Sequence, residues 1–190
     1  VLKLLSINET NLKIITSNVP VHIENYILPS IEPYSGFVTK QEIKILREMF
    51  LPLINNVNNV NKIYISRRKT KKRKLRNELK LEEVLKTFGF VIVYLEELPF
   101  LQQVEIINNA DFIVAPHGAG LANLAFAKNN CKVIEIFPYQ IYNDCFARLS
   151  LNANLHYNYI RCEYDEISSG IIPINEVIKK IEEFSLRFIS

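Results

Sequence analysis

The chain has 190 residues, of which 48% are hydrophobic and 23% are charged, and its formal net charge is +3. This length and composition suit one soluble folded unit with a sizeable core and argue against disorder. Because no run of about 18 apolar residues occurs, we expect neither a membrane span nor an export signal, and we expect a cytoplasmic protein that only partners would link to a membrane.

The opening residues differ in character from the rest of the chain. They are polar and rich in asparagine, with short predicted strands at Lys13–Ile15 and Val21–Ile23. We therefore expect residues 1–36 to be a linker or the remnant of a preceding N-terminal domain, and residues 37–190 to form the main domain. Thr39-Lys40-Gln41-Glu42 has the pattern of a capping box and predicts a helix that continues to Leu53. This helix could pack on the main domain or on a domain outside this sequence.

From Lys62 onward, predicted strands and helices alternate regularly, and Gly89 is placed to end one of the helices. This alternation predicts an α/β fold, a Rossmann-like parallel sheet with helices on both faces. The predicted strands are residues 62–66, 90–94, 111–115, 132–136 and 155–160. The predicted helices are residues 77–88, 101–108, 121–127, 143–149 and 176–188, the last with Asn175 as its cap.

One turn between a predicted strand and a predicted helix combines a histidine with two glycines: His117-Gly118-Ala119-Gly120-Leu121. Glycines let an anion approach the backbone, and a helix N-terminus adds unpaired N–H groups and a partial positive charge. The turn therefore suits a diphosphate, although tight packing and a capping histidine would explain it equally well. Its spacing is neither that of a dinucleotide fingerprint nor that of a Walker loop, so it indicates neither a nicotinamide cofactor nor ATP hydrolysis.

A basic run follows the first strand of the alternation. Without its eight cations the net charge would change from +3 to −5. Ligands of open parallel sheets bind beyond the carboxyl ends of the strands, so this run and the glycine turn should share one rim and form a phosphate site. The alternative is a module that binds nucleic acid or an anionic membrane. The eight residues are Arg67, Arg68, Lys69, Lys71, Lys72, Arg73, Lys74 and Arg76.

Glu135 and the three cysteines are the remaining candidates for a binding or structural role. Glu135 ends a predicted strand, where its carboxylate could accept hydrogen bonds from ribose hydroxyls or be only a solvated charge. Cys131, Cys145 and Cys162 are odd in number and widely spaced, which indicates neither a disulfide framework nor a zinc site. We therefore expect a reducing compartment, no bound metal and no cofactor.

Taken together, these segments resemble glycosyltransferase family 61, over roughly Lys62 to Tyr159. The residues that carry the resemblance are Ile63-Tyr64-Ile65-Ser66-Arg67-Arg68, Arg76-Asn77-Glu78, Gly89-Phe90, Gln103, Ala110, His117 to Phe126, and Glu135. The resemblance implies that this chain is the C-terminal, donor-binding half of a GT-B enzyme. It also implies inverting, metal-independent transfer from a UDP-sugar to a glycan or protein acceptor, as in capsular or other surface polysaccharide synthesis. The acceptor domain, with the general base, would then precede the chain. A remnant that binds UDP without transfer remains an alternative.

The resemblance also implies roles for individual residues. Arg67 and Arg76 would bind the diphosphate, with Arg68 as a substitute, because guanidinium groups pair bidentately with phosphate oxygens. His117 and the N–H groups of Gly118, Ala119, Gly120 and Leu121 would hold the β-phosphate and, with Arg76, stabilise the leaving UDP. Asn77 and Glu78 read instead as a helix cap and a partner of the helix dipole.

Overall fold

The computed structural model of the protein describes residues 2–13, 20, 22–25, 38–55, 60–70, 74–138, 143–164 and 169–186. The chain divides into two units, residues 1–34 and residues 35–190. In the first unit, 3-10 helices span Leu2–Leu5 (η1) and Glu9–Asn11 (η2). The two strands predicted there and the predicted boundary at residues 36 and 37 involve residues outside the described ones. That boundary therefore stays a prediction.

The described part of the second unit contains a seven-stranded sheet in the order β2-β7-β6-β5-β4-β1-β3. Neighbouring strands pair in parallel, except for β6 and β7, which are antiparallel. The Rossmann-like α/β fold is therefore confirmed, with β2 and β7 as additions that we did not predict. The strands are β1 (Lys62–Ile65), β2 (Lys74–Leu75), β3 (Val91–Val93), β4 (Phe112–Pro116), β5 (Lys132–Pro138), β6 (His156–Tyr164) and β7 (Ser169–Ile171).

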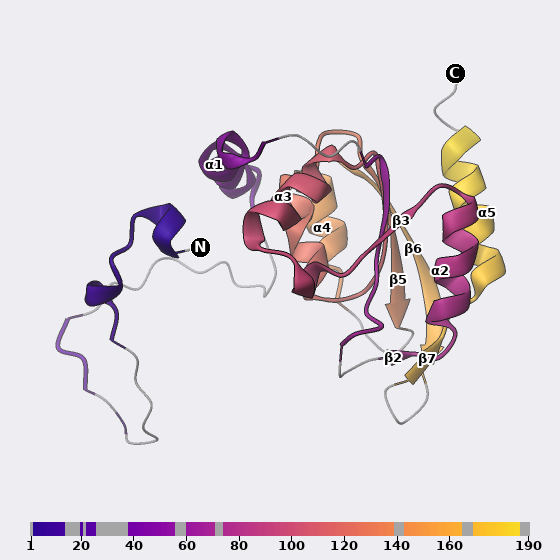
Figure 1. Cartoon of the computed structure of the whole chain (residues 1–190), viewed down its shortest axis with the longest axis horizontal. Helices are drawn as coiled ribbons and strands as arrows, with labels where there is room; N and C mark the ends of the chain where they lie inside the picture. The colour runs from indigo at the N-terminus through magenta and orange to yellow at the C-terminus, as the bar shows by residue number, and fades with distance from the viewer. Residues whose placement is uncertain are drawn as a thin grey trace. The chain divides into compact units, whose positions relative to one another are not determined.

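Helices cover both faces of this sheet. In Figure 1, α3 and α4 lie on one side of the strands, and α2 and α5 lie on the other. The α2 and α5 side holds a continuous apolar core, in which Leu81 and Ile181 meet strand residues such as Ile134. The helices are α1 (Lys40–Phe50), α2 (Glu78–Thr87), α3 (Phe100–Asn109), α4 (Cys145–Asn152) and α5 (Ile174–Leu186), with 3-10 helices η3 (Leu51–Leu53), η4 (Leu95–Glu97) and η5 (Ala119–Phe126).

The predicted start of α1 and end of α2 are confirmed by their geometry. Thr39 Oγ1 accepts a hydrogen bond from the Glu42 N–H, and the Glu42 carboxylate accepts one from the Thr39 N–H, which completes the capping box. Gly89 has a φ of +81°, a left-handed conformation that glycine adopts without strain.

The contacts of Arg47 show where α1 packs. Its guanidinium donates to the carbonyl oxygens of Ala125 at 2.8 Å and of Ala127 at 2.5 Å, at the end of η5. Phe50, the last residue of α1, packs edge-on against Phe100 of α3 at a ring distance of 5.0 Å. The helix therefore belongs to the same unit as the sheet.

Two helices differ from the prediction. The segment after the glycine turn is the 3-10 helix η5 and not an α-helix. The Leu121 N–H donates to the Gly118 carbonyl and the Ala127 N–H to the Leu124 carbonyl, each three residues back, which is the hydrogen-bond spacing of a 3-10 helix. The last helix begins at Ile174, after Pro173, so Asn175 lies inside it and does not cap it.

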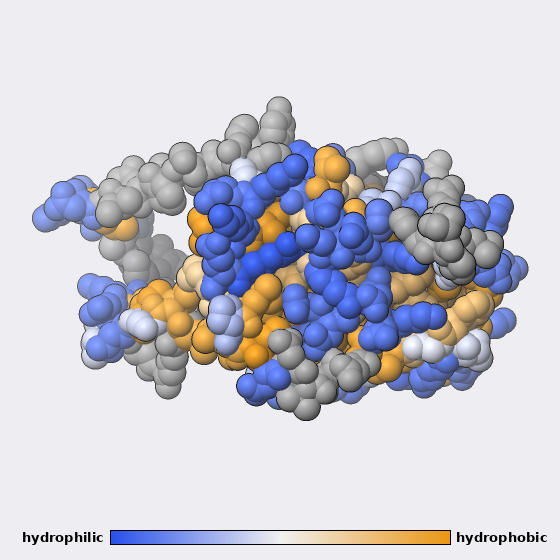
Figure 2. All heavy atoms as spheres, turned by 90° about the horizontal axis from the view of Figure 1, so that it is seen from above, coloured by the Kyte–Doolittle hydropathy of each residue, from blue (hydrophilic) through white to orange (hydrophobic). Residues whose placement is uncertain are grey.

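The surface of the protein is mostly hydrophilic. On the face that Figure 2 shows, hydrophilic side chains cover much of the described surface, and apolar side chains are exposed in smaller areas among them. Among the described residues, most exposed large apolar side chains lie on different elements, as with Leu79 on α2 and Leu151 on α4, and only Ile45 and Met49 share the helix α1. Such scattered exposure is ordinary for a folded domain.

Candidate functional site

The loops after β1, β3, β4 and β5 share one rim of the sheet, because these four strands are parallel neighbours. The loop after β1 carries Arg67 and Arg68, and the loop after β4 carries the glycine turn. β1 and β4 are directly paired, with Tyr64 opposite Val114. The sheet therefore brings the start of the basic run beside the glycine turn.

Arg67 lies directly against Gly118. A Cβ atom on Gly118 would come within 2.0 Å of Nη1 of Arg67, so the absence of a side chain at this position makes room for the guanidinium. Gly118 has a φ of 165°, an extended conformation open to any residue, so the glycine serves this close approach and not an unusual backbone angle. A cationic side chain thus lies on the backbone at the start of η5.

His117 is held by a chain of buried polar groups. Its Nδ1 lies 2.5 Å from Oε1 of Glu135, and the Tyr157 hydroxyl donates to Oε2 of Glu135 at 2.6 Å. Since a carboxylate only accepts, this pairing assigns the proton to Nδ1 and leaves Nε2 as the nitrogen that can meet a ligand. Phe137 and Phe146 pack against the imidazole, with ring centroids at 4.8 and 5.3 Å.

Glu135 is therefore not a solvated strand-end charge. It is 1% exposed, and both of its carboxylate oxygens are engaged, one by His117 and one by Tyr157. Burial, followed by the negative charge of Glu135, raises the pKa of Tyr157, so its phenol stays a neutral donor. The carboxylate orients His117, and the use of Glu135 as a ribose acceptor stays a prediction.

Two buried carboxylates one helical turn apart on α2 hold the backbone that carries Arg67. Oε1 of Glu78 accepts from the Arg67 N–H at 2.7 Å, the Tyr64 hydroxyl at 2.9 Å and the Ser66 hydroxyl at 3.1 Å. Oε1 of Glu82 accepts from the Ser66 hydroxyl at 2.7 Å. Glu78 is therefore a buried acceptor, and not only the dipole partner that we predicted.

The side chain of Arg68 is engaged within the protein. Its Nη2 donates to the Tyr94 hydroxyl at 2.7 Å, and its Nε lies 3.3 Å from Oε1 of the buried Glu82. The hydrogen bond to Tyr94 and the charge of Glu82 raise the pKa of Arg68. The neighbouring Lys69 pairs with Glu97 at 2.5 Å. These contacts commit the side chains of Arg68 and Lys69 to partners within the protein.

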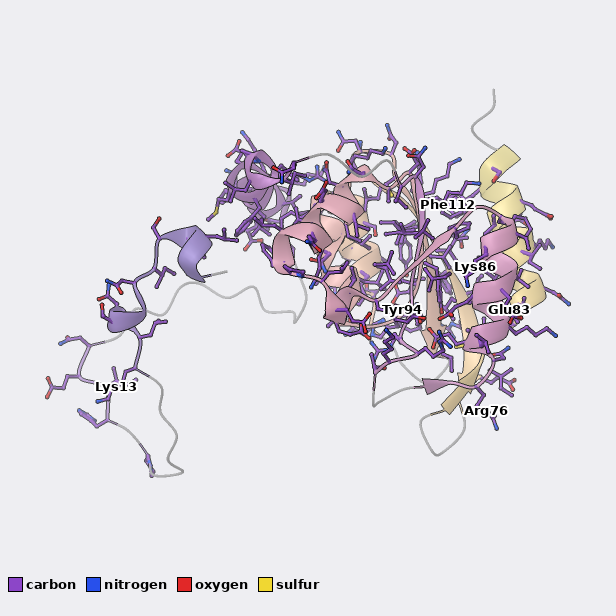
Figure 3. All side chains as sticks on the ribbon, in the orientation of Figure 1. Lys13, Arg76, Glu83, Lys86, Tyr94 and Phe112 are labelled. Carbon is purple, nitrogen blue, oxygen red and sulfur yellow. The ribbon has the colours of Figure 1, made fainter. Side chains whose placement is uncertain are left out.

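Arg76 lies just before α2, two residues before Glu78. It follows β2, its backbone N–H donates to the carbonyl of Gly170 at 2.8 Å, and Figure 3 shows it at the N-terminal end of α2. The next residue, Asn77, is the N-cap residue of α2, as predicted, but its side chain makes no capping hydrogen bond. Its amide instead pairs with both the N–H and the carbonyl of Ile172, at 2.8 Å each. This pairing fixes the short strands β2 and β7.

The N–H groups of the glycine turn do not all face outward. The Leu121 N–H donates to the Gly118 carbonyl at 3.0 Å, and the His117 N–H donates to the Ile136 carbonyl at 2.9 Å. The N–H groups of Gly118, Ala119 and Gly120 remain as the candidates for a phosphate. Gly120 also serves packing, because a Cβ there would lie 3.2 Å from Leu95.

Several residues of this site could not be singled out from the sequence. Tyr157 and Phe146 reach Glu135 and His117 from β6 and α4, and only the register of the folded sheet brings them together. Glu82 did carry a signal, because it lies one helical turn after Glu78 on the helix that follows the basic run. Gln103, whose role was open, donates to the carbonyls of Leu95 and Leu98 and supports the rim.

A cavity of about 340 Å³ lies beside this network, at the start of α4, the carboxyl end of β5 and the first two thirds of β6. Phe137, Tyr157 and Tyr159 form its aromatic walls, and Asp144 and Arg161 add charge. Phe137 and Tyr157 also belong to the surroundings of His117, so the cavity adjoins the polar chain.

Among the described residues, no group of three or more His, Cys, Asp or Glu side chains is arranged to hold a metal ion. In the same part of the chain, no helix has the length and apolar character to cross a bilayer.

Comparison with known proteins connects this geometry to a family. Residues 4–134 match the family model described as Glycosyltransferase 61. Over 101 residues the chain is 32% identical to the EGF domain-specific O-linked N-acetylglucosamine transferase of Canis lupus familiaris, a match that covers 50% of this chain and 19% of that protein. It is 33% identical over 96 residues to the Drosophila melanogaster protein of the same name, covering 49% of this chain and 18% of that protein.

A second kind of relative is the protein O-linked-mannose beta-1,4-N-acetylglucosaminyltransferase 2 of Mus musculus, 35% identical over 78 residues. That match covers 41% of this chain and 13% of the mouse protein. The matched part of the chain thus spans less than a fifth of these relatives. Because the family model matches well over half of its residues, the chain belongs to glycosyltransferase family 61.

Proposed function

We propose that this chain is the donor-binding part of a GT-B glycosyltransferase and that it binds the diphosphate of a UDP-sugar between Arg67 and the turn at Gly118. The observation that carries the proposal is the guanidinium of Arg67 on the backbone of Gly118. A guanidinium beside the first N–H groups of a helix offers charge and hydrogen bonds to the same phosphate oxygens.

The ring of His117 supports the same assignment. With Nδ1 held by Glu135, a proton on Nε2 would make the ring a second cationic donor at the turn. During inverting transfer the bond between the anomeric carbon and the β-phosphate oxygen breaks, and the electron pair passes to UDP. Arg67 and His117 would stabilise that charge without a metal ion, while the general base would lie outside this chain.

The phosphate contacts can contribute only a limited binding free energy. One arginine–phosphate interaction contributes about 1.5–3 kcal/mol and a helix N-terminus about 1 kcal/mol. Their sum corresponds to binding no tighter than about millimolar. Useful affinity for the donor must therefore include contacts to its nucleoside or its sugar.

The relatives indicate which donor to test first. The names of the Canis lupus familiaris and Mus musculus relatives both specify transfer of N-acetylglucosamine. We therefore propose UDP-N-acetylglucosamine as the first donor, and a glycan or protein as the acceptor. A role in surface polysaccharide synthesis rests on the family resemblance alone.

The charge pairs of the basic run weigh against the polyanion-binding alternative. Arg68 and Lys69, the second and third of its cations, are paired with Glu82 and Glu97. Lys71, Lys72 and Arg73 lie outside the described residues. A remnant that binds UDP without transfer differs from an enzyme only when an acceptor domain is supplied, because it would bind the donor and release no UDP.

Substitution of single cations tests the donor site. Arg67→Ala should weaken UDP binding at least tenfold, because it removes the charge at Gly118, whereas Lys69→Ala should change it less than threefold. Calorimetric titration in a low-salt and a high-salt buffer measures both variants. Equal losses in the two variants, with a steep fall of affinity as salt rises, would contradict the proposal and favour polyanion binding.

Arg76→Ala belongs in the same series. The family resemblance predicts at least a tenfold loss of UDP affinity, and the backbone N–H of Arg76 is held by the Gly170 carbonyl. An unchanged affinity would remove Arg76 from the site and leave Arg67 as its arginine.

A further inference from the structure

We propose that the cavity beside α4 binds the nucleoside of the donor, with its base and its ribose; this inference rests on the proposed function. The cavity has a volume of about 340 Å³, which falls in the range of small-molecule sites. Its walls come from β5, β6 and the start of α4, three elements of the same unit. None of the roles given to Arg67, Gly118 and His117 uses it.

The cavity is continuous with the phosphate site through shared side chains. The Phe137 ring lines the cavity and also contacts His117, at a centroid distance of 4.8 Å. Tyr157 lines the cavity too, and its hydroxyl reaches His117 through Glu135. The group that follows the phosphates in the donor would therefore lie next to His117, where this cavity begins at Phe137.

The lining suits a planar base joined to a diol. The aromatic rings of Phe137, Tyr157 and Tyr159 can stack on a base, since every base has a π-face. Asp144 supplies a carboxylate, the acceptor that ribose hydroxyls need. Its side chain is 69% exposed and pairs with Arg148 at 2.8 Å, which orients it at the start of α4.

Asn143 and Arg161 provide donors for the carbonyl oxygens of a pyrimidine. Oδ1 of Asn143 accepts from the Cys145 N–H at 3.0 Å, which leaves its NH₂ group for a ligand. The guanidinium of Arg161 lies 6.0 Å from the ring centroid of Tyr159, the residue two positions before it on β6. Cationic and aromatic surfaces thus alternate along the wall that β6 contributes.

The sugar of the donor is the less suitable occupant. Its anomeric carbon must be open to attack by an acceptor that binds outside this chain, whereas α4 and the sheet wall this cavity within one unit. The diphosphate then lies between a nucleoside in the cavity and a sugar at the open side of the turn.

Filling the cavity tests the inference. Ala147 lines it from α4, and a phenylalanine there would occupy the space of the base. The full 190-residue chain, as wild type and as Ala147→Phe, is titrated with UDP and with inorganic pyrophosphate. We expect the wild type to bind UDP at least tenfold more tightly than pyrophosphate, and Ala147→Phe to bind the two equally, with its pyrophosphate affinity unchanged.

Two matched variants keep the test decisive if Ala147→Phe does not fold. Tyr159→Ala removes a half-exposed wall of the cavity and should weaken UDP binding at least fivefold while pyrophosphate binding is retained. Arg67→Ala should weaken the binding of both ligands. Far-ultraviolet circular dichroism and thermal unfolding confirm that each variant is folded.

The outcomes separate the two proposals. If UDP binds the wild type and both cavity variants equally well, the nucleoside lies elsewhere; the inference fails and the proposed function stands. If the wild type does not prefer UDP over pyrophosphate, the cavity holds no nucleoside and the inference fails as well. If the wild type binds neither ligand, the donor site itself is wrong and both proposals fail.

Discussion

Glu78 shows how one residue can position the phosphate site from behind it. Its Oε1 accepts three hydrogen bonds, among them the Arg67 N–H, while Oε2 is buried without a hydrogen-bond partner among the described residues. Burial raises the pKa of Glu78 and outweighs those hydrogen bonds, which lower it; the nearby Glu82 raises it further. The ionised carboxylate is therefore costly here, although the acceptor is needed.

This balance predicts opposite effects for two substitutions. Because its pKa is raised in the folded state, Glu78 contributes stability below its unfolded pKa, and that contribution is lost as the pH rises through the folded pKa. Glu78→Gln keeps an acceptor without the charge, so at neutral pH its free energy of unfolding should equal or exceed that of the wild type. Glu78→Ala should lose roughly 2–5 kcal/mol, because buried donors are left unpaired. Urea unfolding at several pH values measures both.

Urea unfolding at acidic pH is the control for the Glu78→Gln variant. The advantage of Glu78→Gln over the wild type should vanish below the unfolded pKa, where both side chains are neutral. A glutamine variant that is as unstable as the alanine variant at neutral pH would show that the charge itself holds the loop.

Gly118 is predicted to matter for the ligand more than for the fold. In Gly118→Ala the new methyl group would occupy the place of the Arg67 guanidinium, a flexible side-chain end that can move aside. We expect a change in unfolding free energy below about 1 kcal/mol. UDP affinity should fall about tenfold, since the displaced guanidinium loses its place at the phosphate.

Lys69→Ala is the control for Gly118→Ala, because Lys69 lies on the neighbouring loop and pairs with Glu97. Calorimetry with UDP and urea unfolding on the two variants separate binding from stability. Equal UDP affinity in Gly118→Ala and the wild type would contradict the placement of the diphosphate.

At the scale of elements, Arg47 joins α1 to the sheet unit. Its partly buried guanidinium donates to main-chain carbonyls at the end of η5 and to Ala153 after α4. Arg47→Met keeps the apolar stem but leaves those carbonyls unpaired, so the free energy of unfolding should fall by roughly 2–4 kcal/mol. Urea unfolding measures the loss.

Lys44→Met is the control on the same helix. Lys44 pairs with Glu48 on the surface, with both side chains more than 60% exposed, and such pairs contribute little. Its unfolding free energy should stay within about 0.5 kcal/mol of the wild type. An Arg47→Met protein as stable as this control would mean that α1 does not depend on its contacts with η5.

The elements that could be predicted from the sequence are those with a local signal. β4 and β5 are runs of apolar residues, and α1 begins with a capping box, so their positions follow from neighbours in the chain. β2 and β7 have two and three residues, too few to show a period, and they depend on the side chain of Asn77. The 3-10 form of η5 also escaped prediction, because a three-residue period differs little from a helical one over eight residues.

The site was also predictable only in part, because only some of its residues are neighbours in the sequence. The glycine turn and the basic run are contiguous motifs, and the order of parallel strands brings them to one rim. The partners of Glu135 were not predictable, because His117 lies 18 residues away and Tyr157 lies 22 residues away. Only the pairing of β4, β5 and β6 places those three side chains together.

At the scale of the whole molecule, both faces of the sheet in the second unit place a buried carboxylate behind the ligand rim. The face under α2 and α5 combines a continuous apolar core with Glu78, which accepts from the Arg67 N–H. The other face carries the polar chain from Tyr157 to His117. This arrangement agrees with a domain that binds a donor while an acceptor is bound by another part of the enzyme.

The most direct test of the account is calorimetric titration of the chain with UDP in the presence of a chelator, with UMP and GDP as controls. We expect binding that the chelator does not affect. We also expect UDP to bind at least tenfold more tightly than UMP, which lacks the second phosphate at Arg67, and more tightly than GDP, whose base is larger. No binding at millimolar UDP, or equal binding of all three nucleotides, would contradict the account.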